Sequence, residues 1–212
     1  APKGGRLVQD VTSTSAMNGT FETFDSFNPF VLRGAGATGM DAIYDTLMAG
    51  SSDEPTSLYG LVAQKVRWSA DKLSYTFTMR REARFHDGTP LKAKGHPSYK
   101  LILREFDGAE ALDDHTLAVR FTAKRSRDAH LTVAGLPILP QAFWKDRDFE
   151  APTLDVPLGS GPYRLSRFEQ GRFVEFARVP NYWGRDLPVN VGINNFDVVR
   201  YEYFRDRQIA FE

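Results

Sequence analysis

Three glycines, Gly34, Gly36 and Gly39, have the G-x-G-x-x-G spacing of a dinucleotide-binding turn. In that motif the glycines permit a tight turn and a close approach of the backbone to a pyrophosphate, which faces a helix N-terminus. A helix-like pattern does follow here, but the segments after it are typical of antiparallel hairpins, not of a second parallel strand. The favoured interpretation is therefore a glycine-rich loop, whose exposed amides could hold part of a ligand. A nucleotide-dependent enzyme stays open as the alternative.

The other side chains with chemical potential do not form an enzyme constellation. Asp113 and Asp114 are adjacent, and neighbours in a strand point to opposite faces, so a turn is favoured over paired acid–base work. Ser160 lies between glycines, but Pro162 follows, unlike a Gly-x-Ser-x-Gly nucleophile elbow. The four histidines are His86, His96, His115 and His130. Because no two of them have the i, i+4 spacing of a metal-binding helix, structural roles are expected for them. We predict no catalytic residue, no metal ligand and no cofactor.

Composition narrows the function classes further. The 212 residues include 27 basic and 27 acidic side chains, so the basic surplus of a general nucleic-acid binder is missing. The absence of cysteine excludes a disulfide scaffold, a thiolate zinc site and a cysteine nucleophile. No apolar run approaches the roughly 20 residues of a transmembrane helix, so membrane association is expected to be peripheral only. The length predicts one large domain or two small ones.

Strands dominate the predicted secondary structure. Alternating patterns and hairpin-like connections place them at 7–14, 61–68, 73–79, 101–112, 115–121, 163–168, 173–179 and 198–204. Within the third of these, Tyr75, Phe77 and Met79 alternate with polar residues, so one face is expected to be buried. Hairpins outnumber βαβ units, and the predicted fold class is therefore α+β.

Helices are expected to be few. The clearest one is predicted over residues 40–48, because five apolar residues have helical spacing there while Asp41 and Asp45 fall on the opposite face. A short helix is predicted over 127–134, and the first turns of another over 207–212.

Three widely spaced phrases are more specific than any of these motifs: Phe-His-Asp-Gly-Thr-Pro-Leu at 85–91, Gly-Ser-Gly-Pro-Tyr-Arg at 159–164 and Val-Pro-Asn-Tyr-Trp-Gly at 179–184. They resemble the signature of the family 5 extracellular solute-binding proteins, the oligopeptide, dipeptide and nickel binders of bacterial ABC importers. Within that family the chain is similar to the Yej-type subgroup, which is linked to oligopeptide and microcin C uptake. That similarity rests on further phrases at 24–30, 53–59, 95–99, 136–140 and 194–197.

The resemblance implies the first lobe of a periplasmic-binding-protein-like fold (class II, cluster C), with the second lobe absent. Residues 1–40 and 152–212 would form the main subdomain around a mixed sheet, and residues 41–151 a smaller inserted α+β subdomain. Two departures from the family pattern stand out. Family members are much longer, and the amphipathic helix that they carry after the phrase ending at Leu91 is missing here.

The resemblance also implies where ligand binds, in a cleft between this lobe and the second one. Asn28 is a candidate ligand contact, and so are Arg33, Gly34 and Ala35 in the loop that follows it, because family members contact ligand from the matching loop. Tyr99 is a candidate from the inserted subdomain. Arg33 could pair with a peptide carboxylate or with a phosphate-like group of a nucleotide-peptide antibiotic; the alternative is an exposed solubilising charge. Packing roles, not ligand contacts, are expected for Tyr163, Tyr182 and Trp183.

The implied function is non-catalytic: the periplasmic component of an ABC importer that binds oligopeptides or peptide-like compounds, microcin C types included, and delivers them to a membrane permease. Such receptors close by hinge motion and hold peptide largely through its backbone, with roomy wet pockets for its side chains. Ala1 is expected to follow signal-peptide cleavage in a Gram-negative bacterium. A second chain carrying the missing lobe would be a further partner. The alternatives left open are the nucleotide-binding enzyme and an interaction module that pairs with another chain.

Overall fold

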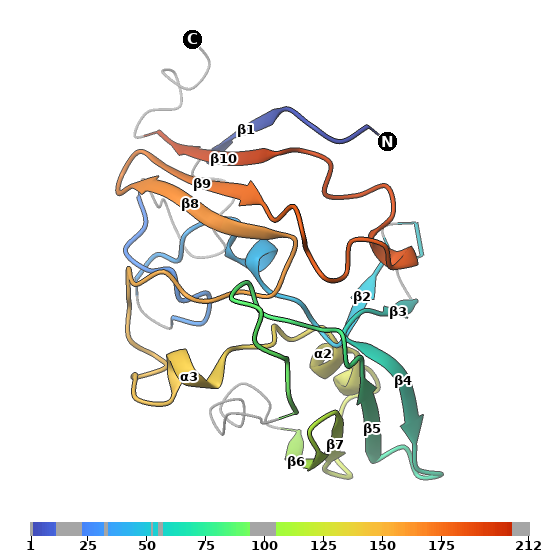
Figure 1. Cartoon of the computed structure of the whole chain (residues 1–212). Coiled ribbons are helices and arrows are strands. Elements are labelled where there is room, and N and C mark those ends of the chain that lie inside the picture. Colours follow the sequence, from blue (N-terminus) through green and yellow to red (C-terminus); the bar gives the residue numbers. More distant parts are fainter. Residues whose placement is uncertain are drawn as a thin grey trace.

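Two four-stranded sheets lie at opposite ends of the molecule (Figure 1). The computed structural model describes residues 2–11, 23–31, 34–51, 53–54, 57–93 and 105–204. One sheet is called the end sheet here, because its strands come from the first and last parts of the described chain. Its strand order is β1 (Arg6–Val11), β10 (Val198–Tyr203), β9 (Phe173–Arg178) and β8 (Tyr163–Glu169). The other is called the middle sheet, because its strands come from the middle of the sequence. Its strand order is β4 (Ala63–Trp68), β5 (Ser74–Met79), β7 (Thr116–Phe121) and β6 (Phe106–Asp113).

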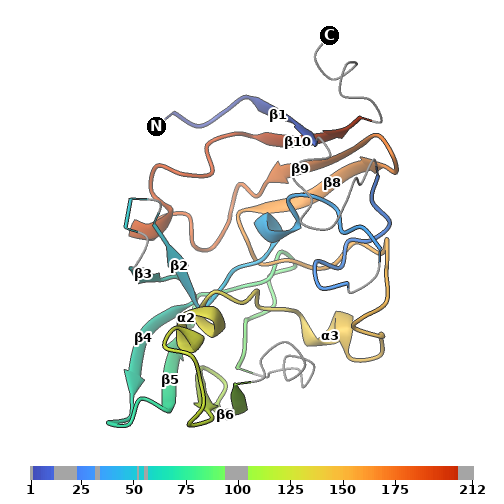
Figure 2. The same cartoon turned by 180° about the vertical axis from the view of Figure 1, so that it is seen from behind.

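The end sheet is mixed, as predicted. β1 runs parallel to β10, with Arg6 opposite Val198, and the remaining pairs are antiparallel. It therefore joins the first strand of the chain to the last described one, which lie side by side in both views (Figures 1 and 2). The middle sheet is antiparallel throughout and uses strands from the middle of the chain. Strands in two four-stranded sheets and one two-stranded sheet, with few helices, confirm the α+β class.

Aromatic side chains fill the core beneath the end sheet. Val174 and Phe176 on β9 point into it and are almost fully buried, because alternate residues of a strand share one face. The ring of Phe24 lies 5.2 Å from that of Tyr203, measured between centroids, and the ring of Phe27 lies 4.8 Å from Phe168 edge-on. Residues 24–27 are thereby packed against the sheet.

The opposite face of the end sheet is organised around a charged residue, Glu175. Only 4% of it is exposed, and Arg167 donates to both carboxylate oxygens at 2.8 and 2.9 Å. Arg6 on β1 adds a contact at 3.3 Å. These hydrogen bonds, chiefly those from Arg167, hold the pKa of Glu175 below its usual value.

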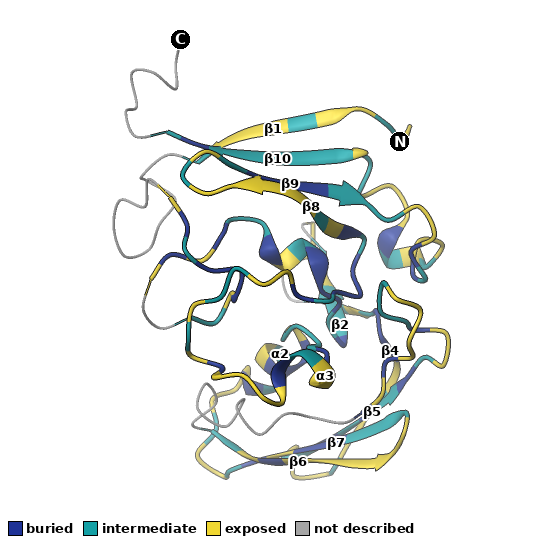
Figure 3. Ribbon diagram, turned by 60° about the vertical axis from the view of Figure 1, so that its left-hand side comes forward, coloured by how far each residue is buried: buried dark blue, intermediate teal, exposed yellow. Residues whose placement is uncertain are grey.

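The middle sheet buries the face that its alternation predicts. Tyr75, Phe77 and Met79 are 6%, 2% and 2% exposed, respectively, and pack into a second hydrophobic cluster. The predicted short helix is present as α2 (Ala129–Ala134), which buries Ala129 and Val133 in the same cluster. In Figure 3, α2 and α3 (Gln141–Trp144) lie between the two sheets.

The helix predicted over residues 40–48 is wrong beyond its first turn. Residues Met40–Ile43 form a single 3₁₀ turn, η1, and Tyr44 is already extended, with φ −114° and ψ 145°. Residues Met48–Gly50 form strand β2, which pairs with β3 (Leu58–Gly60). The sequence pattern also did not predict β3, α3 or the 3₁₀ turn η2 (Pro188–Asn190).

Tertiary hydrogen bonds explain why that helix stops. The carbonyl of Ile43 accepts the N–H groups of Ser160 and Gly161, both at 2.9 Å. The carbonyl of Leu47 accepts from Ala63 at 2.9 Å. A helix over residues 40–48 would use the Ile43 carbonyl to accept the N–H of Leu47, so partners distant in sequence replace that helical bond. Among the described residues, no helix is long and apolar enough to cross a membrane.

Candidate ligand-binding loop

Hydrogen bonds between residues 25–26 and residues 35 and 37 close the loop that carries the candidate ligand contacts. The backbone N–H groups of Asp25 and Ser26 donate to the carbonyl of Ala35 at 2.9 and 3.2 Å, and Ala37 donates back to Ser26 at 2.8 Å. The carboxylate of Asp25 accepts the N–H of Ala35 at 2.8 Å. Asp25 had not been singled out from the sequence; its place in a run of turn-forming Asp, Asn and Pro residues is the signal that could have found it.

Asn28 lies beneath this loop and fixes it to the rest of the chain. Its side chain is fully buried, its Nδ2 donates to the carbonyl of Phe149 at 2.6 Å, and its Oδ1 accepts the N–H of Phe30 at 2.9 Å. A direct contact with ligand was expected at Asn28, but the residue exposes no surface and both ends of its amide are already bonded. We therefore assign it a positioning role, because an amide can donate and accept at the same time.

Gly34 and Ala35 are placed differently from each other. Gly34 is exposed and has φ +107°, a conformation that favours glycine. A Cβ at Gly34 would lie 2.7 Å from the carboxylate oxygens of Asp25, so any side chain would push Asp25 away from the N–H of Ala35. Ala35 itself is buried. The other two candidates, Arg33 and Tyr99, lie outside the described residues.

Replacing Asn28 by Asp should loosen the loop. The isosteric carboxylate would face the carbonyl oxygens of Phe149 and Ala151 in place of a donor, leaving buried groups unpaired. We expect the free energy of unfolding to fall by about 1–3 kcal/mol, measured by urea denaturation. Gln64→Glu, the corresponding change at an exposed position on β4, is the control and should change stability little. Equal stability of both variants would contradict the positioning role.

A buried carboxylate that the sequence pattern had placed on an exposed helix face, Asp45, joins three segments of the chain. Its side chain accepts the O–H of Tyr182 at 2.6 Å and the N–H of the Trp183 indole at 2.7 Å, and its own N–H donates to Ser160 Oγ at 3.1 Å. Only 1% of Asp45 is exposed, and this burial raises its pKa to about 7. Tyr182 is buried and Trp183 packs against the second hydrophobic cluster, and both also donate to Asp45, which the sequence pattern did not predict.

Two glycines allow this junction to close. The backbone at Gly159 and Gly161 passes so near residues 42–44 that a Cβ would lie 2.1 Å from the Ile43 carbonyl oxygen at the first position and 2.8 Å from that of Ala42 at the second. His86 also bonds here, through its Nε2 at 2.9 Å from the carbonyl oxygen of Gly161. Partial burial lowers the pKa of His86. A structural role, as predicted, fits this position.

The geometry of the glycine-rich loop argues against the dinucleotide interpretation. The N–H groups of residues 35, 37 and 38 donate to the Asp25 carboxylate, the Ser26 carbonyl and the Tyr203 hydroxyl, so they are not free to hold a pyrophosphate. The negatively charged Asp25 carboxylate already accepts a hydrogen bond from this loop, where a phosphate group would have to bind. The element that follows is a single 3₁₀ turn, not a helix. Within the described part of the chain, no three His, Asp or Glu side chains gather as a metal site would need.

The arrangement therefore supports non-covalent binding at a backbone loop, held rigid by Asp25 and Asn28. With these two sheets, the chain has part of a solute-binding-protein fold, to which it is similar over 98–99% of its length. The family model of the bacterial extracellular solute-binding proteins, family 5 (middle), matches residues 57–212. The chain belongs to that family.

Relatives of the Yej type match the whole chain. It is 36% identical to the uncharacterized protein YejA of Escherichia coli K12 and 34% identical to the probable peptide-binding protein YejA of Agrobacterium fabrum. It covers 35% and 36% of their lengths, so it spans about a third of these relatives. Among solved structures, the periplasmic binding protein DppA of Helicobacter pylori, in complex with the peptide STSA, superposes with a TM-score of 0.74 at 19% identity, over 99% of this chain and 44% of that one.

Proposed function

We propose that this chain contributes one lobe of the periplasmic substrate-binding component of an ABC importer for oligopeptides or peptide-like compounds. Two observations together carry the proposal. The chain belongs to the family, and its exposed loop at Gly34 is fixed by hydrogen bonds of the Asp25 and Asn28 side chains. A relative carries the name probable peptide-binding protein, and a structural neighbour holds a peptide. Delivery to a membrane permease, and export by a cleaved signal peptide, belong to the same proposal.

The division of the lobe is also proposed here. We infer that residues 1–40 and 152–212 act as one subdomain and residues 41–151 as the inserted one. The strands of the end sheet all lie in the first set and those of the middle sheet in the second, which supports this division. The junction around Asp45 would be the connection between them.

The loop at residues 33–35 is the proposed ligand contact in this lobe, with Tyr99 as a second candidate. Exposed backbone at Gly34 can hydrogen-bond a peptide main chain without selecting its side chains. Arg33 would add a cation for a peptide carboxylate or, in a microcin C type compound, a phosphate-like group.

Nuclear magnetic resonance titration can test this proposal, because it detects weak binding. Tetra-alanine and a phosphoserine tetrapeptide, added to millimolar concentration, should cause saturable shifts in the amide signals of residues 34–37. Gly34→Ala should weaken both at least about tenfold, since its Cβ displaces Asp25. Gly88→Ala is the matched control: Gly88 is also exposed with positive φ, but has open space around it.

Two results would count against the proposal. The first is no saturable shift with any peptide. The second is binding that survives Gly34→Ala as well as it survives Gly88→Ala. A further variant, Arg33→Ala, should weaken the phosphoserine peptide more than tetra-alanine; equal weakening would remove the phosphate-like ligand class from the proposal.

A further inference from the structure

A concave site lies on the middle sheet, among residues that the proposed function does not use. β4 and β5 form one wall, α2 another, and β2 and β3 close one end. Its volume of about 850 Å³ lies within the range of small-molecule pockets. None of its lining residues belongs to the candidate ligand-binding loop or to the junction around Asp45.

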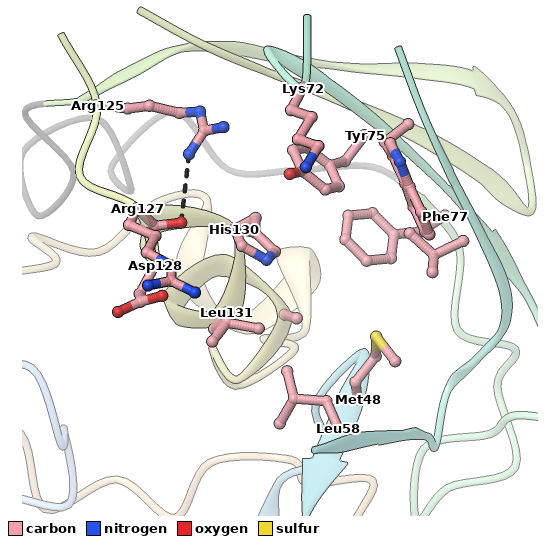
Figure 4. Close-up of a pocket in the computed structure, with 13 residues that line it drawn as sticks. Met48, Leu58, Lys72, Tyr75, Phe77, Arg125, Arg127, Asp128, His130 and Leu131 are labelled. Carbon is pink, nitrogen blue, oxygen red and sulfur yellow. Dashed lines mark hydrogen bonds between the residues drawn. The ribbon is translucent and has the colours of Figure 1, made fainter. Parts of the chain in front are cut away.

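One end of this pocket is apolar. Figure 4 shows Met48 and Leu58 there, with Leu131 of α2 and Phe77 of β5 adjoining. Trp68 continues the apolar lining along β4 and is 58% exposed, an unusual position for so large a ring. An apolar body placed in this pocket would cover Trp68 and gain from the area removed from water.

The other end is cationic. Lys72 and Arg125 lie there in Figure 4, and Arg127 is on the adjoining wall. Within the described ranges, none of these three has a carboxylate within the 4.0 Å of a salt bridge. Arg125 is held in place by its Nη1, which donates to the carbonyls of Ser126 and Arg127 at 3.0 and 3.3 Å. Asp128 contributes a single opposing charge to the lining.

The aromatic pair between the two ends adds no charge at neutral pH. His130 stacks on Tyr75 with ring centroids 4.9 Å apart and planes 9° from parallel. Burial and the nearby Arg125 lower the pKa of His130, so the imidazole is neutral at pH 7. Among the lining residues, three cations face one carboxylate, and the cations lie at one end and the apolar surface at the other. Asp71 and Glu105, outside the lining, also act electrostatically on Arg125.

We propose that this pocket binds a small amphipathic anion, a carboxylate carried on an unbranched alkyl or aryl body. The carboxylate would lie between Lys72 and Arg125, and the body would lie along Trp68 and Phe77 toward Met48. Guanidinium and ammonium groups both form charge-assisted hydrogen bonds with carboxylates. A neutral apolar ligand would leave the cations unused, and a cationic one would be repelled.

Decanoate, kept below its micelle concentration, is the probe for this site. It should bind saturably, quenching or shifting the fluorescence of Trp68, with confirmation by calorimetry. Decyltrimethylammonium, which has the same tail and the opposite charge, should bind at least tenfold more weakly, and so should propionate, which lacks the tail. Lys72→Ala with Arg125→Ala should weaken decanoate about tenfold. Trp68→Ala, followed by calorimetry, should also weaken it.

Lys65→Ala with Arg67→Ala is the matched control, because these are exposed cations of β4 that do not line the pocket. It should leave the decanoate affinity unchanged. Thermal melts of each variant separate loss of binding from loss of folding. The proposal is overturned by an absence of saturable decanoate binding, by equal binding of the anionic and cationic amphiphiles, or by equal effects of the two double variants.

Discussion

Gly159→Ala should destabilise the protein by about 3 kcal/mol or more. The added Cβ would lie 2.1 Å from the carbonyl oxygen of Ile43, which is a backbone atom and cannot rotate away. The same carbonyl accepts the N–H groups of Ser160 and Gly161, so moving it would break both bonds. Urea denaturation followed by circular dichroism gives the free energy of unfolding.

Gly108→Ala is the matched control for this change. Gly108 is also a buried glycine, on β6, but the nearest atom to its Cβ would be the side-chain Nη2 of Arg120 at 3.8 Å. We expect it to change stability by less than about 1 kcal/mol, since alanine also restricts the unfolded chain. A Gly159→Ala protein as stable as Gly108→Ala would mean that the junction yields more readily than its geometry indicates.

Asp45 should make the protein less stable as the pH rises from about 4 to 7. The pKa of Asp45 is raised to about 7 in the folded state, against about 3.9 in an unfolded chain. Between these values the folded protein holds a proton that the unfolded chain has lost, so raising the pH favours unfolding. The difference of about three pKa units corresponds to at most about 4 kcal/mol, fully present below pH 4 and lost above pH 7.

Comparison with Asp45→Asn isolates this contribution from other titrating groups. His86, with its lowered pKa, and Glu175, with its lowered pKa, change stability in the opposite direction. They are present in both proteins, so the difference in unfolding free energy between wild type and variant, measured from pH 4 to 8, reports Asp45. A difference that does not change with pH would contradict the raised pKa.

The strands could be predicted from the sequence because their burial follows local alternation. Tyr75, Phe77 and Met79 alternate with polar neighbours, and the sheet buries one face as that pattern requires. The helix over residues 40–48 could not be predicted correctly for the converse reason. Its spacing was helical, but the carbonyl of Ile43 is taken by the chain more than 100 residues later, and local spacing carries no information about that partner.

The candidate site could likewise be predicted from the sequence only in part. Family resemblance led to the loop at residues 33–35, whereas the groups that hold it, Asp25 and the Asn28 amide, are defined by contacts to Ala35 and Phe149. Helical spacing placed Asp45 on the face opposite the apolar residues, whereas the structure buries it. Its partners, Tyr182 and Trp183, lie 137 and 138 residues away along the chain.

The parallel pairing of β1 with β10 has a consequence for how the chain folds. Val8 lies opposite Arg200, so the end sheet can be completed only after residues 198–203 are available to pair with residues 6–11. Closing so long a loop costs conformational entropy before any contact repays it. The middle sheet, with all its strands between residues 63 and 121, needs no such closure. It can form first, and the first strand then has to stay unpaired until β10 arrives.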